Sequence, residues 1–273
     1  MPFTIRDIPA TMRLRGMTVG AAMMDRWFSG DAWTMTIPEK RGDVSIAAIS
    51  GDKIDIRLAT MRWASGFGRF TSAQHHLLNS WSTPPRLERG VNRLSEQFRA
   101  WFLSHPADRT RSFRFGDLGA SVATIEATCQ MNLDPVPSGV WDPLDDFYAA
   151  IGEGSVKLAV TGMVTPQADG KYRLAIDEVG TYLRDTYDFI GSQPLGFWSR
   201  YGVQKVLFPP IGIPIDPKTA DNDGDWSRGN FYYVSNGSFN EYRQMFGKGR
   251  DFFVHSDVER KKLPAPVVVT VAP

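Results

Sequence analysis

The spacing of the hydrophobic residues changes near residue 150, and this change most constrains how the chain can fold. Before it, residues 86–104 carry an apolar side chain every three to four positions, which is the spacing of one helix face. The apolar positions are Leu87, Val91, Leu94, Phe98, Trp101 and Phe102. This segment is the clearest amphipathic helix in the sequence, and His105-Pro106 ends it.

After residue 154 the pattern becomes an alternation of apolar and polar residues, which is typical of strands with one buried face. Residues 156–161 and 172–176 alternate in this way, and turn-forming residues 166–170 separate them, so we expect an antiparallel hairpin. The fold class predicted is α+β, with a mainly helical part (residues 1–150) packed on an antiparallel β-rich part (residues 151–273). No flexible linker separates the parts, so they are expected to share one core.

The same signals predict the remaining elements. A helix is expected at 18–30, followed by a hairpin of strands 44–50 and 53–58 around Gly51-Asp52. Helical spacing continues over 59–81 until Pro84-Pro85, and a short helix with a carboxylate cap is expected at 142–152. Further along we expect a strand at 231–235, a helix at 237–246 and a strand at 251–256. The tail from residue 264 is either an edge strand or a frayed end.

Composition excludes several classes of protein. The chain has 273 residues, is 42% hydrophobic and carries 31 basic against 30 acidic residues, so it can bury a core and no nucleic-acid partner is expected. A single cysteine, Cys129, rules out an intramolecular disulfide. We expect no transmembrane segment, because no apolar run approaches about 18 residues. The amino terminus lacks the pattern of a signal peptide, which predicts a cytoplasmic location in the producing cell.

One stretch is basic although the whole chain is nearly neutral. Its arginines are Arg86, Arg89, Arg93, Arg99, Arg109, Arg111 and Arg114, and its acids are Glu88, Glu96 and Asp108. Most such faces are simply solvated, and the alternative is an anion-binding role.

An acidic run at residues 221–225 invites a calcium interpretation. It departs from the EF-hand pattern, because Trp226 stands where the loop requires glycine and Tyr232 stands where the bidentate glutamate belongs. A solvated acidic turn is the better interpretation.

Residues 178–189 predict a strand that ends in a dense group of polar side chains. The group comprises Tyr182, Arg184, Asp185, Tyr187 and Asp188. Charged and hydroxyl groups are costly to remove from water unless they are paired. The segment is therefore either a structural corner or a functional site, and the sequence leaves both open.

Several segments resemble a proteobacterial family of unknown function, and the similarity covers nearly the whole chain. The similar segments include Ile8-Pro9, Ala21-Ala22, Trp27-Phe28 and residues 115–118, 143–150, 184–189, 195–198, 247–252 and 256–258. Members of that family are commonly encoded near type VI secretion genes. The resemblance implies a toxin, an immunity protein or a delivery adaptor, and it implies no particular reaction.

A shorter segment resembles the colicin M-type bacteriocins, which cleave the pyrophosphate-linked lipid carrier of peptidoglycan synthesis. Their signature is Asp-x-Tyr-Asp followed shortly by His-Arg, and Asp185, Tyr187 and Asp188 match its first half. The second half is missing, because Pro194 occupies the position where histidine would fall. His255 would replace that histidine only if the fold brings it close to Asp185 and Asp188.

This resemblance implies roles for the matching residues and for nearby charges. Asp185 and Asp188 would hold a divalent cation such as Mg²⁺ or orient a water molecule, with Tyr187 beside them. His255 would be the acid or base near neutral pH. The cations that would stabilise charge on phosphoryl oxygens are Arg184, Arg200 and Arg243.

The structural alternative assigns the same residues to stability alone. In it Asp185 caps a turn, Tyr187 anchors a corner, and Asp188 pairs with Arg243 or Arg250.

Two functions from different classes follow. The first is an antibacterial effector of type VI secretion that hydrolyses a phosphoester in the target-cell periplasm. The second is a non-enzymatic adaptor, chaperone or immunity protein that binds a type VI secretion component or an effector. For an effector, the expected partner is a cognate immunity protein.

Overall fold

The computed structural model describes residues 3–139, 142–204 and 231–273. Within it the chain divides into two units, each assembled from segments that are distant in sequence. The first unit comprises Met1–Lys40, Pro137–Glu153 and Thr186–Phe253, and the second comprises Arg41–Val136, Gly154–Asp185 and Val254–Pro273. This division differs from the break at residue 150 that the hydrophobic spacing suggests, because long-range strand pairing joins segments from both halves of the sequence.

The first unit is built mainly of short helices. Its helices are η1 (Ile5–Asp7), α1 (Ile8–Leu14), α2 (Thr18–Ser29), α8 (Asp146–Ala150) and α9 (Asn236–Phe246). Its own small sheet has the strand order β7-β6-β8, from Val203–Gln204, Pro194–Trp198 and Tyr232–Ser235. Helix α3 (Ile37–Arg41) ends where the second unit begins.

The second unit contains most of a seven-stranded sheet and the longest helix of the described chain. Its helices are η2 (Ile46–Ala48), η3 (Gly51–Lys53), α4 (Met61–Ala64), α5 (Gly68–Ser80), α6 (Pro84–Ser104), η4 (Pro106–Arg109) and α7 (Val122–Thr128). The strands of the sheet are β1 (Ile54–Asp55), β2 (Phe113–Phe115), β3 (Gln130–Val136), β4 (Gly154–Pro166), β5 (Tyr172–Tyr187), β9 (Phe252–His255) and β10 (Glu259–Val271). The last two residues of β5 and the first two of β9 belong to the first unit.

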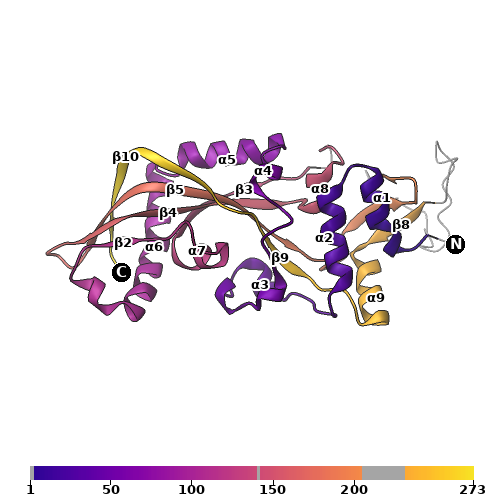
Figure 1. Ribbon diagram of the computed structural model, residues 1–273, viewed down its shortest axis with the longest axis horizontal. Helices are drawn as coiled ribbons and strands as arrows, with labels where there is room; N and C mark the ends of the chain where they lie inside the picture. The colour runs from indigo at the N-terminus through magenta and orange to yellow at the C-terminus, as the bar shows by residue number, and fades with distance from the viewer. Residues whose placement is uncertain (1–2, 140–141, 205–230) are drawn as a thin grey trace. The chain divides into compact units, whose positions relative to one another are not determined.

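The ladder between β4 and β5 organises this sheet. The strand order is β1-β9-β5-β4-β2, with β10 also paired to β5 and β3 also paired to β4 (Figure 1). The antiparallel register runs from Ser155 opposite Arg184 to Pro166 opposite Tyr172. Asp177 is an extra residue in β5, where the register shifts between Thr161 and Gly162.

The two faces of the sheet are covered by different helices. Neighbouring residues of a strand point to opposite faces, and Thr181 and Tyr182 show which helix lies on each. Thr181 is hydrogen-bonded to Gln74 of α5, whereas Tyr182 points toward Glu126 of α7. Helix α6 contacts β3 and β10, the strands that pair with β4 and β5.

In the first unit a carboxylate completes the start of α2. The first backbone N–H groups of a helix have no partner within the helix and favour negative charge. Asp146 of α8 accepts hydrogen bonds from the backbone N–H groups of Val19 (3.1 Å) and Gly20 (2.8 Å). A Cβ atom on Gly20 would lie 2.8 Å from the Cβ of Ala149, so glycine permits this close helix contact.

The structure confirms the α+β fold class and most of the elements expected from periodicity. The helices at 18–30 and 86–104, the hairpin of β4 and β5, and the elements from 231 to 256 all form. The tail is a strand paired along β5 rather than a frayed end. The acidic run at residues 221–225 lies outside the described residues.

Two expectations were wrong in detail. The predicted hairpin at 44–58 is absent from the described chain, and η2, η3 and the two-residue β1 take its place. The helical stretch expected over 59–81 divides into α4 and α5. It does end before Pro84-Pro85, at Ser80, and the two prolines form the first turn of α6, where a missing N–H costs nothing. In the described part of the chain, no helix combines the length and apolar content needed to span a bilayer.

Two glycines in the second unit test how tightly the sheet is packed. Gly116 follows β2 with φ 77°, and a Cβ there would lie 2.3 Å from the carbonyl oxygen of Val160. Gly170 has nearly the same φ, 78°, with no atom within 4 Å of its Cβ position.

We expect Gly170→Ala to cost about 1–2 kcal/mol of unfolding free energy through backbone strain alone. Gly116→Ala should cost at least about 1 kcal/mol more, because the strand must also move. Urea unfolding of both variants checks this, and equal losses would contradict the packing argument.

Candidate functional site

The candidate residues named from the sequence do not all belong to the same unit of the structure. Tyr187, Asp188 and Arg243 belong to the first unit, whereas Asp185 and His255 belong to the second. Asp185 is buried near the end of β5. We therefore consider the polar contacts of each unit separately.

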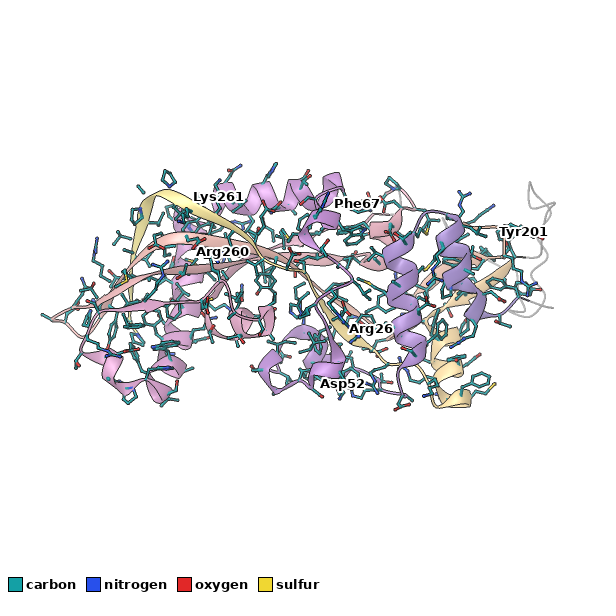
Figure 2. The ribbon with its side chains drawn as sticks, in the orientation of Figure 1. Arg26, Asp52, Phe67, Tyr201, Arg260 and Lys261 are labelled. Atoms are coloured by element: carbon teal, nitrogen blue, oxygen red, sulfur yellow. The ribbon has the colours of Figure 1, made fainter. Side chains whose placement is uncertain are left out.

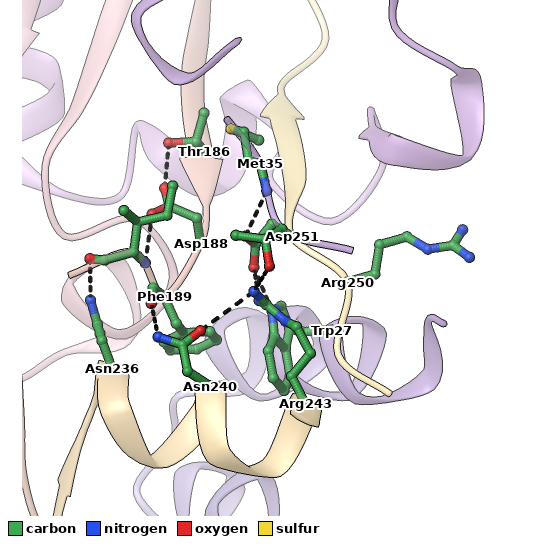
Figure 3. Close-up of polar contacts among 12 residues, drawn as sticks. Trp27, Met35, Thr186, Asp188, Phe189, Asn236, Asn240, Arg243, Arg250 and Asp251 are labelled. Atoms are coloured by element: carbon green, nitrogen blue, oxygen red, sulfur yellow. Dashed lines mark hydrogen bonds and ion pairs between the residues drawn. The ribbon is translucent and has the colours of Figure 1, made fainter. Parts of the chain in front are cut away.

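Asp188 is held by an internal ion pair and a turn. Its carboxylate lies 2.8 Å from Lys40 Nζ. It also accepts hydrogen bonds from Thr186 Oγ1 (2.9 Å) and the Ile190 backbone N–H (3.2 Å), and Figure 3 shows the contact with Thr186. Only 2% of the Asp188 side chain is exposed. A carboxylate that accepts a backbone N–H two residues ahead stabilises a turn. The expected cation was Arg243 or Arg250, but Lys40 occupies that role.

Arg243 of α9 pairs with Asp251 instead. Asp251 is fully buried and accepts hydrogen bonds from Arg243, from the Trp27 indole N–H (2.9 Å) and from the Met35 backbone N–H (3.0 Å) (Figure 3). Arg243 also donates to Thr34, and its guanidinium lies 5.1 Å from the centre of the Trp27 ring. Burial raises the pKa of Asp251 above its ordinary value, although the bonds from Trp27 and Arg243 oppose this.

Tyr187 is part of an aromatic core. Its ring stacks on Phe252 with centroids 5.2 Å apart and meets the edge of Phe189 at 5.6 Å. Burial raises the pKa of the Tyr187 phenol far above its ordinary value. The hydroxyl therefore stays protonated at neutral pH, which suits a packing role.

His255 lies in a buried cluster of the second unit that the sequence did not predict. Its Nε2 atom lies 2.9 Å from a Glu126 carboxylate oxygen, and Lys157 Nζ lies 2.7 Å from the other oxygen. The Tyr182 hydroxyl lies 3.5 Å from Glu126, at the limit of a hydrogen bond. We call Glu126, Lys157, Tyr182 and His255 the Glu126 cluster. It links α7 to strands β4, β5 and β9.

The charges of this cluster depend strongly on one another. Burial alone would raise the pKa of Glu126, but the hydrogen bond from His255 and the charge of Lys157 outweigh it and lower that pKa well below its ordinary value. Burial also lowers the pKa of Lys157 and raises that of Tyr182. Glu126 is thus ionised at neutral pH, so the protonated Nε2 of His255 donates to it.

The His255 and Tyr182 side chains of the cluster are fully buried, whereas Lys157 and Glu126 are each 11% exposed. His255 is 0% exposed, and its other ring nitrogen, Nδ1, is buried with no hydrogen-bond partner among the described residues. Nearby Cys129 is buried as well, and burial raises the pKa of its thiol to about 11. A histidine, a carboxylate and a lysine can exchange protons. In the Glu126 cluster their hydrogen bonds and ion pairs instead join α7 to β4, β5 and β9.

The sequence carried only faint signals for these partners. Lys157 is a charged residue in an otherwise largely apolar run of β4, and Glu126 lies on a short helix 129 positions before His255. The sequence signal for the Arg243–Asp251 pair is stronger, because Asp251 lies only eight positions after Arg243 and just beyond the Gly247–Gly249 turn. The two residues were nevertheless not expected to pair. Over residues 3–139, 142–204 and 231–273, no three His, Cys, Asp or Glu side chains are grouped as a metal site would require.

Comparison with known proteins identifies the family. A family model described as a family of unknown function, DUF6402, matches residues 3–271. The chain belongs to the DUF6402 family. Neither a curated protein nor a solved structure matches this DUF6402 chain significantly. The family description names no activity, so the connection to type VI secretion and the similarity to colicin M stay predictions.

Because of the Glu126 cluster, the free energy of unfolding of the DUF6402 chain should depend on pH in the acidic range. Because the fold lowers the pKa of Glu126 below 4.5, its ordinary value, ionised Glu126 stabilises the fold above that pH. This stabilisation is lost as pH falls from there through the lower pKa of the folded state. Glu126→Gln should cost about 3–5 kcal/mol at pH 7, because Lys157 loses its buried counter-charge and His255 loses the carboxylate that accepts its hydrogen bond. The loss should shrink as the pH falls below about 4.

Denaturant unfolding at a series of pH values measures this effect. Glu96→Gln is the matched control, because Glu96 lies on the exposed face of α6. A Glu126→Gln variant that unfolds like the control at pH 7 would show that the cluster contributes nothing to stability.

The Arg243–Asp251 pair gives a parallel prediction for the first unit. Asp251→Asn keeps the volume of the side chain but leaves Arg243, only 7% exposed, without its anion. We expect a loss of about 3 kcal/mol or more. The control is Asp31→Asn, which breaks a pair with Lys248 at an Asp31 side chain that is 78% exposed, and it should cost much less, because solvent screens an exposed pair. Thermal melts of the two variants that shift equally would refute a structural role for the buried pair.

Proposed function

We propose that this DUF6402 chain is a non-enzymatic binding protein, an adaptor, chaperone or immunity protein, that acts in competition linked to type VI secretion. One observation carries the proposal. The side chains of Asp188, Arg243 and His255, three of the five catalytic candidates from the sequence, are all buried and bonded within the chain.

Catalytic groups must reach a substrate. A general base has to approach the proton it removes within hydrogen-bond distance, and a cation that stabilises phosphoryl charge has to face the reacting oxygens. Asp188 is instead engaged by Lys40, Arg243 by Asp251, and His255 by Glu126. These contacts favour the binding role over the hydrolase role.

The type VI setting comes from the family resemblance of the sequence, and it defines the candidate partners. An adaptor or chaperone would bind an effector or a secretion component, and an immunity protein would bind a toxin. Each of these three roles needs a stable fold and a recognition surface, and none of them requires an exposed catalytic group.

Expression in a susceptible bacterium tests the proposal. The wild-type chain, directed to the cytoplasm or to the periplasm, should leave growth unchanged, because a binding protein has no substrate to destroy. In a separate binding assay, the purified chain is mixed with the purified product of each neighbouring secretion gene in turn. One of these proteins should form a saturable complex with the chain.

The variant Asp188→Asn distinguishes the two functions. If the wild type is toxic and a folded Asp188→Asn protein is not, the hydrolase role is correct and the binding role fails. Asp142→Asn, which removes a carboxylate outside all the candidate sites, is the matched control. Folding of both variants is checked by circular dichroism, so that loss of structure is not mistaken for loss of catalysis.

A further inference from the structure

The C-terminal part of α6, η4 and the two residues after it present a concentrated group of exposed basic side chains. Arg99, His105, Arg109 and Arg111 are all exposed, and Leu103 projects among them with 82% of its surface exposed. We call these five residues the Arg99 patch. They lie within a single stretch of the second unit, around the end of α6 (Figure 1).

The only acid within this stretch is turned inward. Asp108 is buried, accepts the indole N–H of Trp101 at 3.0 Å and binds Arg111 Nε at 2.8 Å. The hydrogen bond from Arg111 is the main reason that the pKa of Asp108 lies below its ordinary value. Solvated surfaces usually mix charges of both signs, so three arginines with only a buried acid between them form an unusual surface.

Packing contacts hold the patch in place. The His105 ring stacks on Trp101 with centroids 3.9 Å apart, and the Arg109 guanidinium lies 5.2 Å from the centre of the Phe102 ring. The Tyr172 hydroxyl of β5 donates to the Arg109 carbonyl oxygen at 3.2 Å. A surface that is ordered before it binds loses less entropy on binding, which favours recognition.

We propose that the Arg99 patch is the docking surface for an acidic segment of a partner protein. Arg99 and Arg109 would face carboxylates, Arg111 stays paired with Asp108, and Leu103 would enter an apolar spot of the partner. This proposal rests on the binding role proposed above and names the chemistry of the partner. Arginine and aromatic residues are typical of the residues that dominate binding energy at protein interfaces.

A protein partner suits the patch better than nucleic acid does. Proteins that bind DNA strongly through its backbone neutralise roughly six to ten phosphates, and this patch offers only a few cations on a chain of net charge +1. An exposed leucine gains nothing from a phosphate backbone but gains burial against a protein. Arg114, the next arginine, is already paired with Asp177.

Fluorescence anisotropy on the full chain tests the proposal. The probe is a labelled peptide in which glutamates flank one leucine, and the comparison probes are the same peptide with lysines and a single-stranded oligothymidine. We expect the acidic peptide alone to bind, with an affinity that falls as salt rises. Arg99→Glu with Arg109→Glu should weaken binding at least about tenfold, whereas Arg99→Lys with Arg109→Lys should keep it within about threefold.

The matched control reverses two other exposed arginines of the second unit. Arg57→Glu with Arg62→Glu changes net charge equally and should leave peptide binding unchanged. If Arg109→Glu lowers thermal stability, Arg99→Glu with Leu103→Ser replaces it, because both side chains lie on the exposed surface of α6. That variant should also weaken binding about tenfold.

Three results would overturn the proposal: no binding of the acidic peptide, equal weakening by the control variant, or tighter binding of oligothymidine. The outcome is independent of the growth assay. A harmless chain that ignores the peptide loses only this docking surface, whereas a toxic chain that requires Asp188 loses the binding role itself.

Discussion

The second unit depends on the antiparallel ladder between β4 and β5. Its register, from Ser155 opposite Arg184 to Pro166 opposite Tyr172, decides which side chains share a face. A shift of one residue would send every core side chain toward the wrong helix. The extra residue Asp177 keeps both ends of β5 in phase with β4, and its carboxylate holds Arg114 of β2 through two hydrogen bonds. The ladder thus fixes where α5, α6 and α7 can pack.

Each unit also contains a buried carboxylate that joins several elements. Glu126 gathers Lys157 and His255 in the second unit, and Asp251 gathers Arg243, Trp27 and a backbone N–H in the first. Such groups contribute little net stability compared with apolar packing, but removing one partner leaves a buried charge. They are therefore specific cross-links, and they occupy the side chains that chemistry at a surface would need.

What remains exposed suggests how the protein works. The polar groups that looked catalytic in sequence are enclosed, while the end of α6 displays cations around Leu103 and hides its acid, Asp108. The net charge of +1 conceals this local asymmetry, because acidic residues elsewhere balance it. These two observations are the basis for proposing recognition of another protein, and hydrolysis stays the alternative that the growth assay tests.

By itself the sequence determined the α+β class, the amphipathic helix that became α6, and the hairpin of β4 and β5. These features depend on spacing between near neighbours, which a sequence displays directly. It also marked Asp188, Arg243 and His255 as unusual. Only the tertiary structure decided what they do, because Lys40 lies 148 positions from Asp188 and Glu126 lies 129 positions from His255. A charge needs a partner, but which partner it meets is settled by how distant segments pack.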